Sequence, residues 1–335
     1  MSKQIIHIET EQLERDGLQQ NLPGFDSKYH NIVDYILKIT EVIWEHKEID
    51  VIYDTYEKDI LIHTGARKIN GVKEVIDGTN NTLVSFPDRK MGAEAVIWST
   101  DKKGDFYSSH RILSTATNLG NTNYGKPTGE KIRFRTVADC KIANNKIYEE
   151  WLVRDNLYIL QQLRFDPVEM AKKDSTYVKN SISISVNTPT DVKYQKLSSP
   201  EELVYSLITN VWKHEKLEEI ENYFSENSVL HAICNHNVGG ILEIRKYVAS
   251  ILNSFKEVSV NVDRITSNRK NNSTEIAARW YIRGEVTKLG VFGVDSKGEV
   301  FVPIVSHYVV ENGKITDEWM VYDGFDALCQ IYSQF

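Results

Sequence analysis

The sequence predicts an α+β protein built from two tandem domains, and an internal repeat is the main evidence for this. The hexapeptide EWLVRD at 150–155 returns as EWMVYD at 318–323, an offset of 168 residues. The same offset aligns further identical residues: Trp44 with Trp212, His63 with His231, Arg111 with Arg279, and Gln162 with Gln330. Solenoid repeats have periods of roughly 20–50 residues. A longer repeat that covers most of both halves therefore indicates two copies of one domain.

Each copy begins with segments of helical periodicity. In the first copy, apolar residues recur at helical spacing at Ile32, Ile36, Ile39 and Ile43. The second copy opens with SPEE at 199–202, which predicts Ser199 as the N-cap, proline at the first helical position and a glutamate three residues after the cap. A short second helix and a strand follow, and a third helix starts after Gly71 or Gly240.

The remainder of each copy predicts a long antiparallel meander. In the first copy the later strands are expected at 110–117, 132–142 and 147–156. The pairs Asn144-Asn145 and Asn312-Gly313 separate the last two strands of each copy and suit a tight turn with positive φ. A curved antiparallel sheet with three helices on one face is the architecture that such a pattern favours.

The repeat and the composition together divide the chain into four parts. We expect a polar N-terminal arm at 1–30, a first domain at 31–172, a linker rich in Ser, Thr and Asn at 173–197, and a second domain at 198–335. Each domain is long enough to bury its own core.

Composition excludes several classes of partner. The chain is 41% hydrophobic and 26% charged with a net charge of -7, and no basic stretch is interleaved with aromatics, so we expect no nucleic-acid binding. We expect no membrane span and no signal peptide, because long apolar runs are missing. Cys140, Cys234 and Cys329 are widely spaced, which argues against disulfides and zinc and favours the cytoplasm. No histidine pair has metal-ligand spacing, so we expect no metal.

The last strand of each copy carries the first candidate site residues. Side chains alternate between the faces of a strand, so Trp151, Val153 and Asp155 are expected on one face, with the matching face at 319–323. An aspartate beside Trp and Val lies either on a solvated surface or in an apolar cavity. In a cavity its pKa would rise, which suits acid–base catalysis near neutrality. A carboxylate satisfied by a neighbouring Arg or by backbone amides is the alternative.

Histidines and arginines supply the other candidates. His63 and His231 end the first strand of each copy and are either hydrogen-bonded core residues or a general base and polar anchor. Arg111 and Arg279 lie in central strands, where they either pair with the aspartates or hold an oxyanion of a ligand. His307 has Asp139 as its counterpart. This difference implies that the two pockets bind different compounds or that one of them is inactive.

Four of these features together resemble a known family. FPD at 86–88, the strand with Arg279-Trp280, the turn VENGKI at 310–315 and the Trp-x-x-x-Asp strand are similar to the SnoaL-like polyketide cyclase group, in the nuclear transport factor two-like superfamily. The resemblance covers both halves. It implies two tandem cone-shaped domains, each a curved antiparallel sheet wrapped around three helices with a deep apolar pocket.

The resemblance also implies an activity. Similar proteins include cyclases that close a ring by an intramolecular aldol step, with an aspartate as acid–base and without metal or cofactor. By position that aspartate resembles Asp155 and Asp323, and the pocket histidines resemble His63, His231 and His307. We take these five as the candidate catalytic residues. The candidate substrate-binding residues are Trp151, Trp319, Arg111 and Arg279.

Two functions remain open at this point. The first is an enzyme of cyclase or isomerase type that binds a small, mostly apolar or aromatic carbonyl compound. The second is a non-catalytic binding or scaffold protein, in which the two copies form a pseudo-dimer within one chain, with or without further homodimerisation. The fold does not decide between them.

Overall fold

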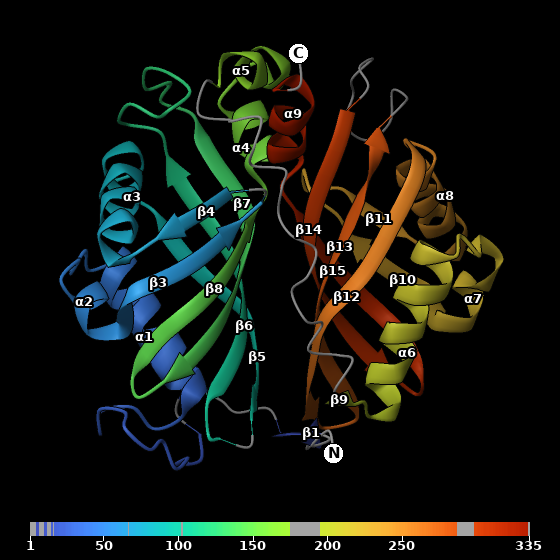
Figure 1. Ribbon diagram of the computed structural model, residues 1–335, viewed down its shortest axis with the longest axis horizontal. Helices are drawn as coiled ribbons and strands as arrows, with labels where there is room; N and C mark the ends of the chain where they lie inside the picture. The colour runs from blue at the N-terminus through green and yellow to red at the C-terminus, as the bar shows by residue number, and fades with distance from the viewer. Residues whose placement is uncertain are drawn as a thin grey trace.

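The computed structural model describes most of both domains. The described residues are 5–6, 10–11, 15, 17–65, 67–101, 103–174, 195–286 and 298–333. Most of the linker predicted at 173–197 lies outside them. The two domains stand side by side, with their sheets facing each other and helices α1 to α3 and α6 to α8 on the outer sides (Figure 1).

The first domain, called domain 1 here, has a six-stranded sheet. Its helices are α1 (Ile32–Trp44), α2 (Val51–Thr55), α3 (Val72–Ser85), α4 (Asn156–Gln162) and α5 (Pro167–Lys173). Its strands are β3 (Tyr56–Thr64), β4 (Arg67–Asn70), β5 (Lys90–Thr100), β6 (Phe106–Thr117), β7 (Lys131–Ala143) and β8 (Lys146–Arg154). The order across the sheet is β4-β3-β8-β7-β6-β5.

Domain 2 repeats this arrangement. Its helical elements are α6 (Ser199–Leu207), the π-helical turn η2 (Ile208–Lys213), the short 3-10 turn η3 (Leu217–Glu219), α7 (Ile220–Tyr223), α8 (Ile241–Leu252) and α9 (Gly324–Tyr332). Its strands are β10 (Phe224–His231), β11 (Asn237–Gly239), β12 (Phe255–Lys270), β13 (Ser273–Val286), β14 (Gly298–Glu311) and β15 (Lys314–Tyr322). Strand β2 (Thr10–Glu11) of the N-terminal arm pairs with β12 at the edge of this sheet, and β1 (Ile5–Ile6) pairs with β9 (Gln195–Lys196). Across the described ranges, no helix is both long and apolar enough to cross a membrane.

The α+β class and the tandem arrangement predicted from the sequence are confirmed, and the structure adds one detail. Neighbouring strands in the meander are antiparallel, but β3 pairs with β8 and β10 pairs with β15 in parallel. Each sheet is therefore mixed rather than fully antiparallel, because the last strand of the meander lies beside the first strand of the domain and runs in the same direction.

Local sequence signals explain the turns and the helix starts. The φ angles are 49° and 68° at Asn144 and Asn145, and 51° and 73° at Asn312 and Gly313, as expected for the predicted tight turns. The start of α6 differs by one residue from the prediction. Ser198, not Ser199, is the N-cap, and its backbone N–H donates to Glu201 Oε2 at 2.8 Å in a capping box.

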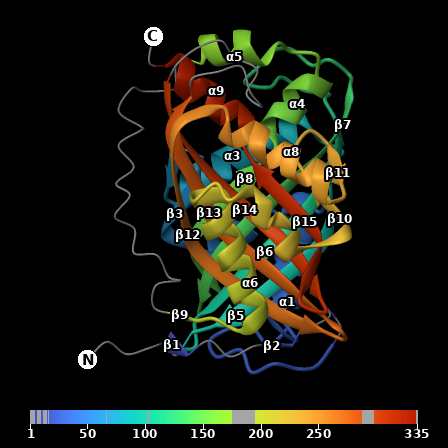
Figure 2. The ribbon, with the colours of Figure 1, turned by 90° about the vertical axis from the view of Figure 1, so that its right-hand side faces the viewer.

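The last strand of each domain ends earlier than predicted. Strand β8 ends at Arg154, and Asp155 is the N-cap of α4, where its side chain accepts from the backbone N–H of Tyr158 at 3.1 Å. In domain 2, Asp323 caps α9 in the same way. Aspartate is among the preferred N-cap residues. Helices α4, α5 and α9 gather at the same end of the molecule (Figure 2).

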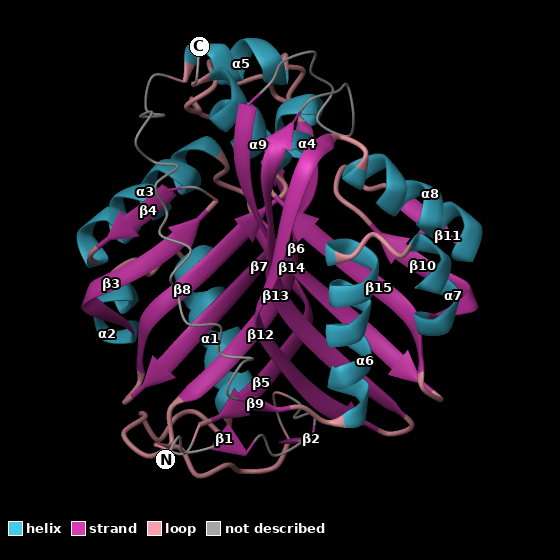
Figure 3. Ribbon diagram, turned by 45° about the vertical axis from the view of Figure 1, so that its right-hand side comes forward, coloured by secondary structure: helices cyan, strands magenta, loops and turns pink. Residues whose placement is uncertain are grey.

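The two sheets pack against each other through the faces that turn away from the outer helices (Figure 3). A small apolar cluster marks the centre of this contact and contains Val137, Val153, Val305 and Val321. Polar contacts surround it: Ser109 Oγ lies 2.7 Å from His307 Nε2, and Asn268 exchanges two hydrogen bonds of 2.8 Å with the backbone of Trp98. Each sheet therefore has one face toward the other domain and one face toward its own helices.

Candidate functional site

Domain 1 contains a cavity of about 380 Å³ between its sheet and helices α1 and α3. Apolar side chains make up much of the wall, among them Ile36, Ile39, Ile43, Trp44, Ile62 and Ile112. Sites for small molecules typically have volumes of about 300–1,000 Å³ and mostly apolar walls with a few polar groups. The cavity therefore has the size and lining of a small-molecule site.

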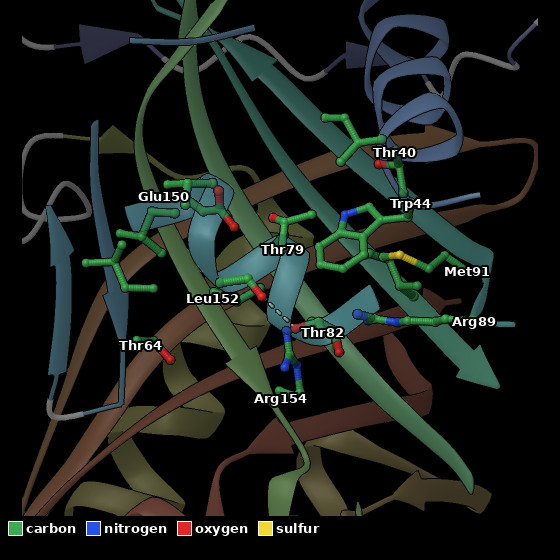
Figure 4. A pocket seen from close by; sticks show the side chains of 18 of the residues that line it. Thr40, Trp44, Thr64, Thr79, Thr82, Arg89, Met91, Glu150, Leu152 and Arg154 are labelled. Carbon is green, nitrogen blue, oxygen red and sulfur yellow. Dashed lines mark hydrogen bonds between the residues drawn. The ribbon is translucent and has the colours of Figure 1, made fainter. Parts of the chain in front are cut away.

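Strand register determines which side chains of the sheet face this cavity. Across β6, β7 and β8, His110 lies opposite Ala138, which lies opposite Leu152. Along β8, Glu150 lies two residues before Leu152 and Arg154 two residues after it, so each belongs to the next row of paired residues across the sheet. Because side chains alternate along a strand, these three β8 residues share the inner face. Figure 4 shows Glu150 and Arg154 toward opposite ends of the cavity.

Five buried polar atoms that line the cavity form no hydrogen bond within the described part of the chain. They are Arg89 Nη1, His110 Nε2, Thr136 Oγ1, Glu150 Oε2 and Arg154 Nε. Most buried polar groups in proteins have a hydrogen-bond partner, and leaving one unpaired costs about 1–3 kcal/mol. These atoms leave hydrogen-bond donors and acceptors available on the wall of the cavity.

Glu150 and His110 are two buried titratable residues that line the cavity. Glu150 is 5% exposed, and burial raises its pKa to about 7. His110 is 3% exposed, and burial lowers its pKa to about 3, so its imidazole is neutral at neutral pH. A carboxyl group with a pKa near the ambient pH can both accept and donate a proton.

Two arginines stand toward the other end of the cavity. Arg89 is 3% exposed, stacks on Trp44 with its guanidinium carbon 4.6 Å from the ring centroid, and donates to Ser114 Oγ at 3.0 Å. Arg154 extends from β8 toward the same region, and both side chains point into the cavity (Figure 4). Burial lowers the pKa of each arginine, most strongly that of Arg89.

The corresponding interior of domain 2 is filled by larger side chains. Trp280 stands where domain 1 has Ile112, Tyr308 replaces Cys140, and Tyr322 replaces Arg154. On the helices, Tyr247 of α8 occupies the position of Gly78 in α3, since each is the seventh residue of its helix. The space that remains beside Met320 and Tyr322 is about 10 Å³. Glu318, the counterpart of Glu150, also has one buried oxygen without a partner among the described residues, but no cavity of comparable size adjoins it.

Comparison with known proteins identifies the family. The sequence pattern of one family, described as SnoaL-like polyketide cyclase, matches residues 35–163 and 202–331. The chain belongs to this SnoaL-like family. No curated protein matches the sequence.

Several solved structures are similar to about two fifths of the chain. AclR from Streptomyces galilaeus is 19% identical, and the alignment covers 40% of this chain and 98% of AclR with a TM-score of 0.35. A SnoaL-like polyketide cyclase from Agrobacterium tumefaciens is 18% identical over 39% of this chain and 96% of its own, with a TM-score of 0.32. TsrD from Streptomyces laurentii is 11% identical over 39% and 93%, with a TM-score of 0.35.

None of the nine site residues predicted from the sequence lines the cavity of this SnoaL-like protein. Seven of them meet instead at or beside the contact between the sheets. His63 stacks on Trp151 with ring centroids 4.9 Å apart, and His231 stacks on Trp319 at 4.7 Å. His63 Nε2 lies 3.0 Å from Glu149, and His231 Nε2 lies 3.3 Å from Asp317. These groups lie on the face of the last strand that turns toward the other domain. Glu150, Leu152 and Arg154 occupy the face toward the cavity.

The two strand arginines each reach the tryptophan of the other SnoaL-like domain. Arg279 lies over Trp151 and Arg111 over Trp319, with guanidinium carbons 3.6 and 3.8 Å from the ring centroids. Each also donates to a carboxylate of its own sheet, Arg279 to Asp263 at 2.7 Å and Arg111 to Glu94 at 3.1 Å. These contacts correspond to the ion-pair alternative, although the partners are not Asp155 and Asp323.

His307 and Asp139 occupy equivalent positions but make different contacts. Asp139 accepts from Arg279 Nη1 at 3.0 Å across the domain contact, and Tyr107 donates to it as well. His307 is buried against Ser109, and burial together with nearby Arg111 lowers its pKa well below the usual range. The difference between the copies predicted at this position therefore affects the contact between the sheets rather than a ligand pocket.

Asp155 and Asp323 link the two domains at the helix caps. Asp155 accepts from the backbone N–H of Cys234 in domain 2 at 2.6 Å, and Asp323 accepts from the side chain of Asn156 in domain 1. Burial raises the pKa of Asp155 to about 6, and burial together with Asp326 raises that of Asp323 to about 7. Both carboxylates are thus engaged by amide groups, which was the alternative to a catalytic cavity position.

The cavity residues Glu150, His110, Arg89 and Arg154 were not among the sequence candidates. One signal was present, because glutamate opens the hexapeptide in both copies, at 150 and 318. Alternation along the strand places the side chains of this glutamate and of Trp151 on different faces of the sheet. The sequence does not show which of the two faces packs against the helices. His110 and Arg89 have neither a repeated counterpart nor a motif that marks them.

Proposed function

We propose that domain 1 binds a small, mostly apolar carbonyl compound in its cavity and that Glu150 transfers a proton to and from it. The observation that carries this proposal is the position of Glu150. Its carboxyl group is buried in the cavity wall, has one oxygen without a partner among the described residues, and has a pKa raised by burial to about 7. Pockets with a perturbed carboxyl group are common features of active sites.

The chemistry that fits these groups is enolisation. The Glu150 carboxylate removes a proton from the carbon next to the carbonyl, and the electron pair of that C–H bond moves to the carbonyl oxygen. His110 lies on the neighbouring row of the sheet and is neutral, so its Nε2, in the N–H tautomer, can donate a hydrogen bond to the enolate oxygen. Return of the proton to another carbon of the ligand gives an isomer. Attack of the enolate carbon on a second carbonyl of the same molecule, with the proton passing from Glu150 to the oxygen of that carbonyl, closes a ring.

Domain 2 supports a different role. Its interior is filled by aromatic side chains, and one face of its sheet is covered by domain 1. A filled pocket and an occupied sheet are the features expected of a scaffold. We therefore assign the ligand to domain 1 and a structural role to domain 2, so that the tandem copies act as a pseudo-dimer within the chain.

Proton exchange in heavy water tests the catalytic part of this proposal. We would follow loss of the α-proton NMR signals of 2-tetralone, a small apolar ketone, with the wild-type chain and with Glu150→Gln. The expected result is exchange faster than in buffer for the wild type and at the buffer rate for the variant. Glu318→Gln is the matched control, because Glu318 has the same strand position and a pKa also raised to about 7 but lies in the filled domain. Equal exchange by the wild type and Glu150→Gln would refute the role of Glu150.

A further inference from the structure

Arg89 is a buried cation without an acidic partner. Its contacts are Ser114 Oγ, the ring of Trp44 and the ring of Phe134, whose centroid lies 5.3 Å from the guanidinium carbon. Within the described ranges no carboxylate pairs with it, and its one charged neighbour is another cation, Arg154. A hydroxyl and two aromatic rings stabilise a buried cation less than a carboxylate would, and a buried charge without a counter-charge is destabilising. A structural role therefore does not account for this residue.

Arg154 brings a second guanidinium to the same end of the cavity. Its Nε is buried without a partner, and Tyr124, Asp323 and Glu150 are its electrostatic neighbours. The carboxylate of Asp323 accepts from the amides of α9 and from Asn156, and within the described ranges no ion pair joins it to Arg154. In domain 2, where the interior is filled, tyrosine replaces Arg154. The second cation thus occurs in the domain that has the cavity.

We propose that the ligand of domain 1 carries a carboxylate group, which Arg89 and Arg154 bind at the end of the cavity opposite Glu150. This inference rests on the proposed function, since it takes the cavity to be a site for a small, mostly apolar compound. It goes further by naming an anionic group on that compound and the residues that recognise it.

The apolar wall favours a carboxylate over a phosphate. Arg89 Nη1 carries two N–H groups and Arg154 Nε carries one, all without a partner among the described residues, and such groups bind carboxylate oxygens. A phosphate would bring a third oxygen and more charge into a mostly apolar wall. Glu150 and Arg154 are four residues apart on β8, or about 13 Å along the strand. This is a spacing of backbone positions, and it favours as ligand a keto acid whose carbonyl and carboxylate are separated by several bonds.

Binding of a matched pair of probes tests the carboxylate. Naphthalene-2-carboxylate and naphthalene-2-carboxamide have nearly the same shape and differ in charge. Smaller and larger aryl carboxylate–carboxamide pairs extend the range of size, and naphthyl phosphate tests the other anion. We expect calorimetry at neutral pH to show carboxylates bound at least about tenfold more tightly than their amides by the wild type. Equal affinity, tighter binding of the phosphate, or no binding by any carboxylate of the series would overturn the proposal.

Arginine variants locate the preference. Arg154→Met and Arg89→Met keep the length of the side chain, and we expect each to lose the preference for the carboxylate. Arg133→Met is the control, because Arg133 is exposed on the same sheet and its loss changes the net charge equally. Melting temperatures without ligand show whether each variant folds. If Arg89→Met does not fold, the result for Arg154→Met decides whether the arginines bind the carboxylate. A preference that survives in the folded variants refutes the assignment. Loss of proton exchange in Glu150→Gln is measured separately, so the two proposals can fail independently.

Discussion

The guanidinium carbon of Arg279 lies 3.6 Å from the centroid of the Trp151 indole, although the two residues belong to different domains. Its Nη1 also donates to Asp139 of domain 1, and its Nε donates to Asp263 of its own sheet. The Trp-x-x-x-Asp strand, which is the most visible motif of the repeat, thus serves the contact between the domains. The side chains of this strand that line the cavity, Glu150 and Arg154 among them, lie on its opposite face.

Removal of the Arg279 charge should destabilise the whole chain. Arg279→Met leaves Asp139 and Asp263 without their cation, and Asp139 is fully buried. Breaking a buried ion pair by removing one partner costs about 3–5 kcal/mol. We expect a loss of this size in the free energy of unfolding, measured by urea denaturation. Arg283→Met, which removes a pair at the surface with Glu299, should cost less than about 1 kcal/mol. Similar losses in both variants would contradict the central role of Arg279.

Glu150 should make stability depend on pH. Its pKa is about 7 in the folded protein against a usual value of 4.5, so the folded state binds more protons between these values. Stability contributed by this group is full below its unfolded pKa and is lost as the pH rises through about 7. Glu150→Gln should therefore gain about 3 kcal/mol relative to the wild type between about pH 4 and pH 8, by the relation between pKa shift and free energy.

Denaturation curves at several pH values measure this difference. Glu41→Gln is the control, since Glu41 lies outside the cavity and its side chain is 40% exposed. A constant difference between the wild type and Glu150→Gln over the whole pH range would show that the carboxyl group is not held in an apolar environment.

Domain 2 suggests how the cavity of domain 1 can be closed. An added Cβ at Gly78 meets no atom within 4 Å, and Tyr247 fills the equivalent place in α8. Gly78→Tyr should therefore block binding of 2-tetralone and of the naphthalene probes without loss of the fold, as measured by calorimetry and melting temperature. Gly78→Ala should keep binding and stabilise the helix by about 0.5–1 kcal/mol. Full binding by Gly78→Tyr would mean that the ligand lies elsewhere.

The sequence predicted the architecture well because the evidence for it is local and repeated. Turn residues such as Asn144 and Asn312, and the aligned hexapeptides, required no knowledge of packing. The site was harder to predict from the sequence. The alternation of side chains along β8 defines two faces but does not show which face lines the cavity. Trp151 and Arg279 are conspicuous in the sequence because each has an identical counterpart in the other copy, and all four residues contribute to the domain contact. Arg89 and His110 are not repeated in domain 2, and only the three-dimensional structure places them in the same cavity as Glu150.

The double variant Asp155→Asn with Asp323→Asn separates the two readings of the repeat. Each aspartate caps a helix and accepts from the other domain. Asn is about as good an N-cap as Asp, so we expect the double substitution to weaken the two helix caps only slightly. Because neither carboxylate lines the cavity, we expect exchange of the 2-tetralone α-protons at the wild-type rate below the melting temperature. Glu150→Gln, measured beside it, provides the inactive reference. Loss of exchange in a folded double variant would return catalysis to the aspartates, as the resemblance to the cyclases implied, and would leave Glu150 with the role of a buried acid.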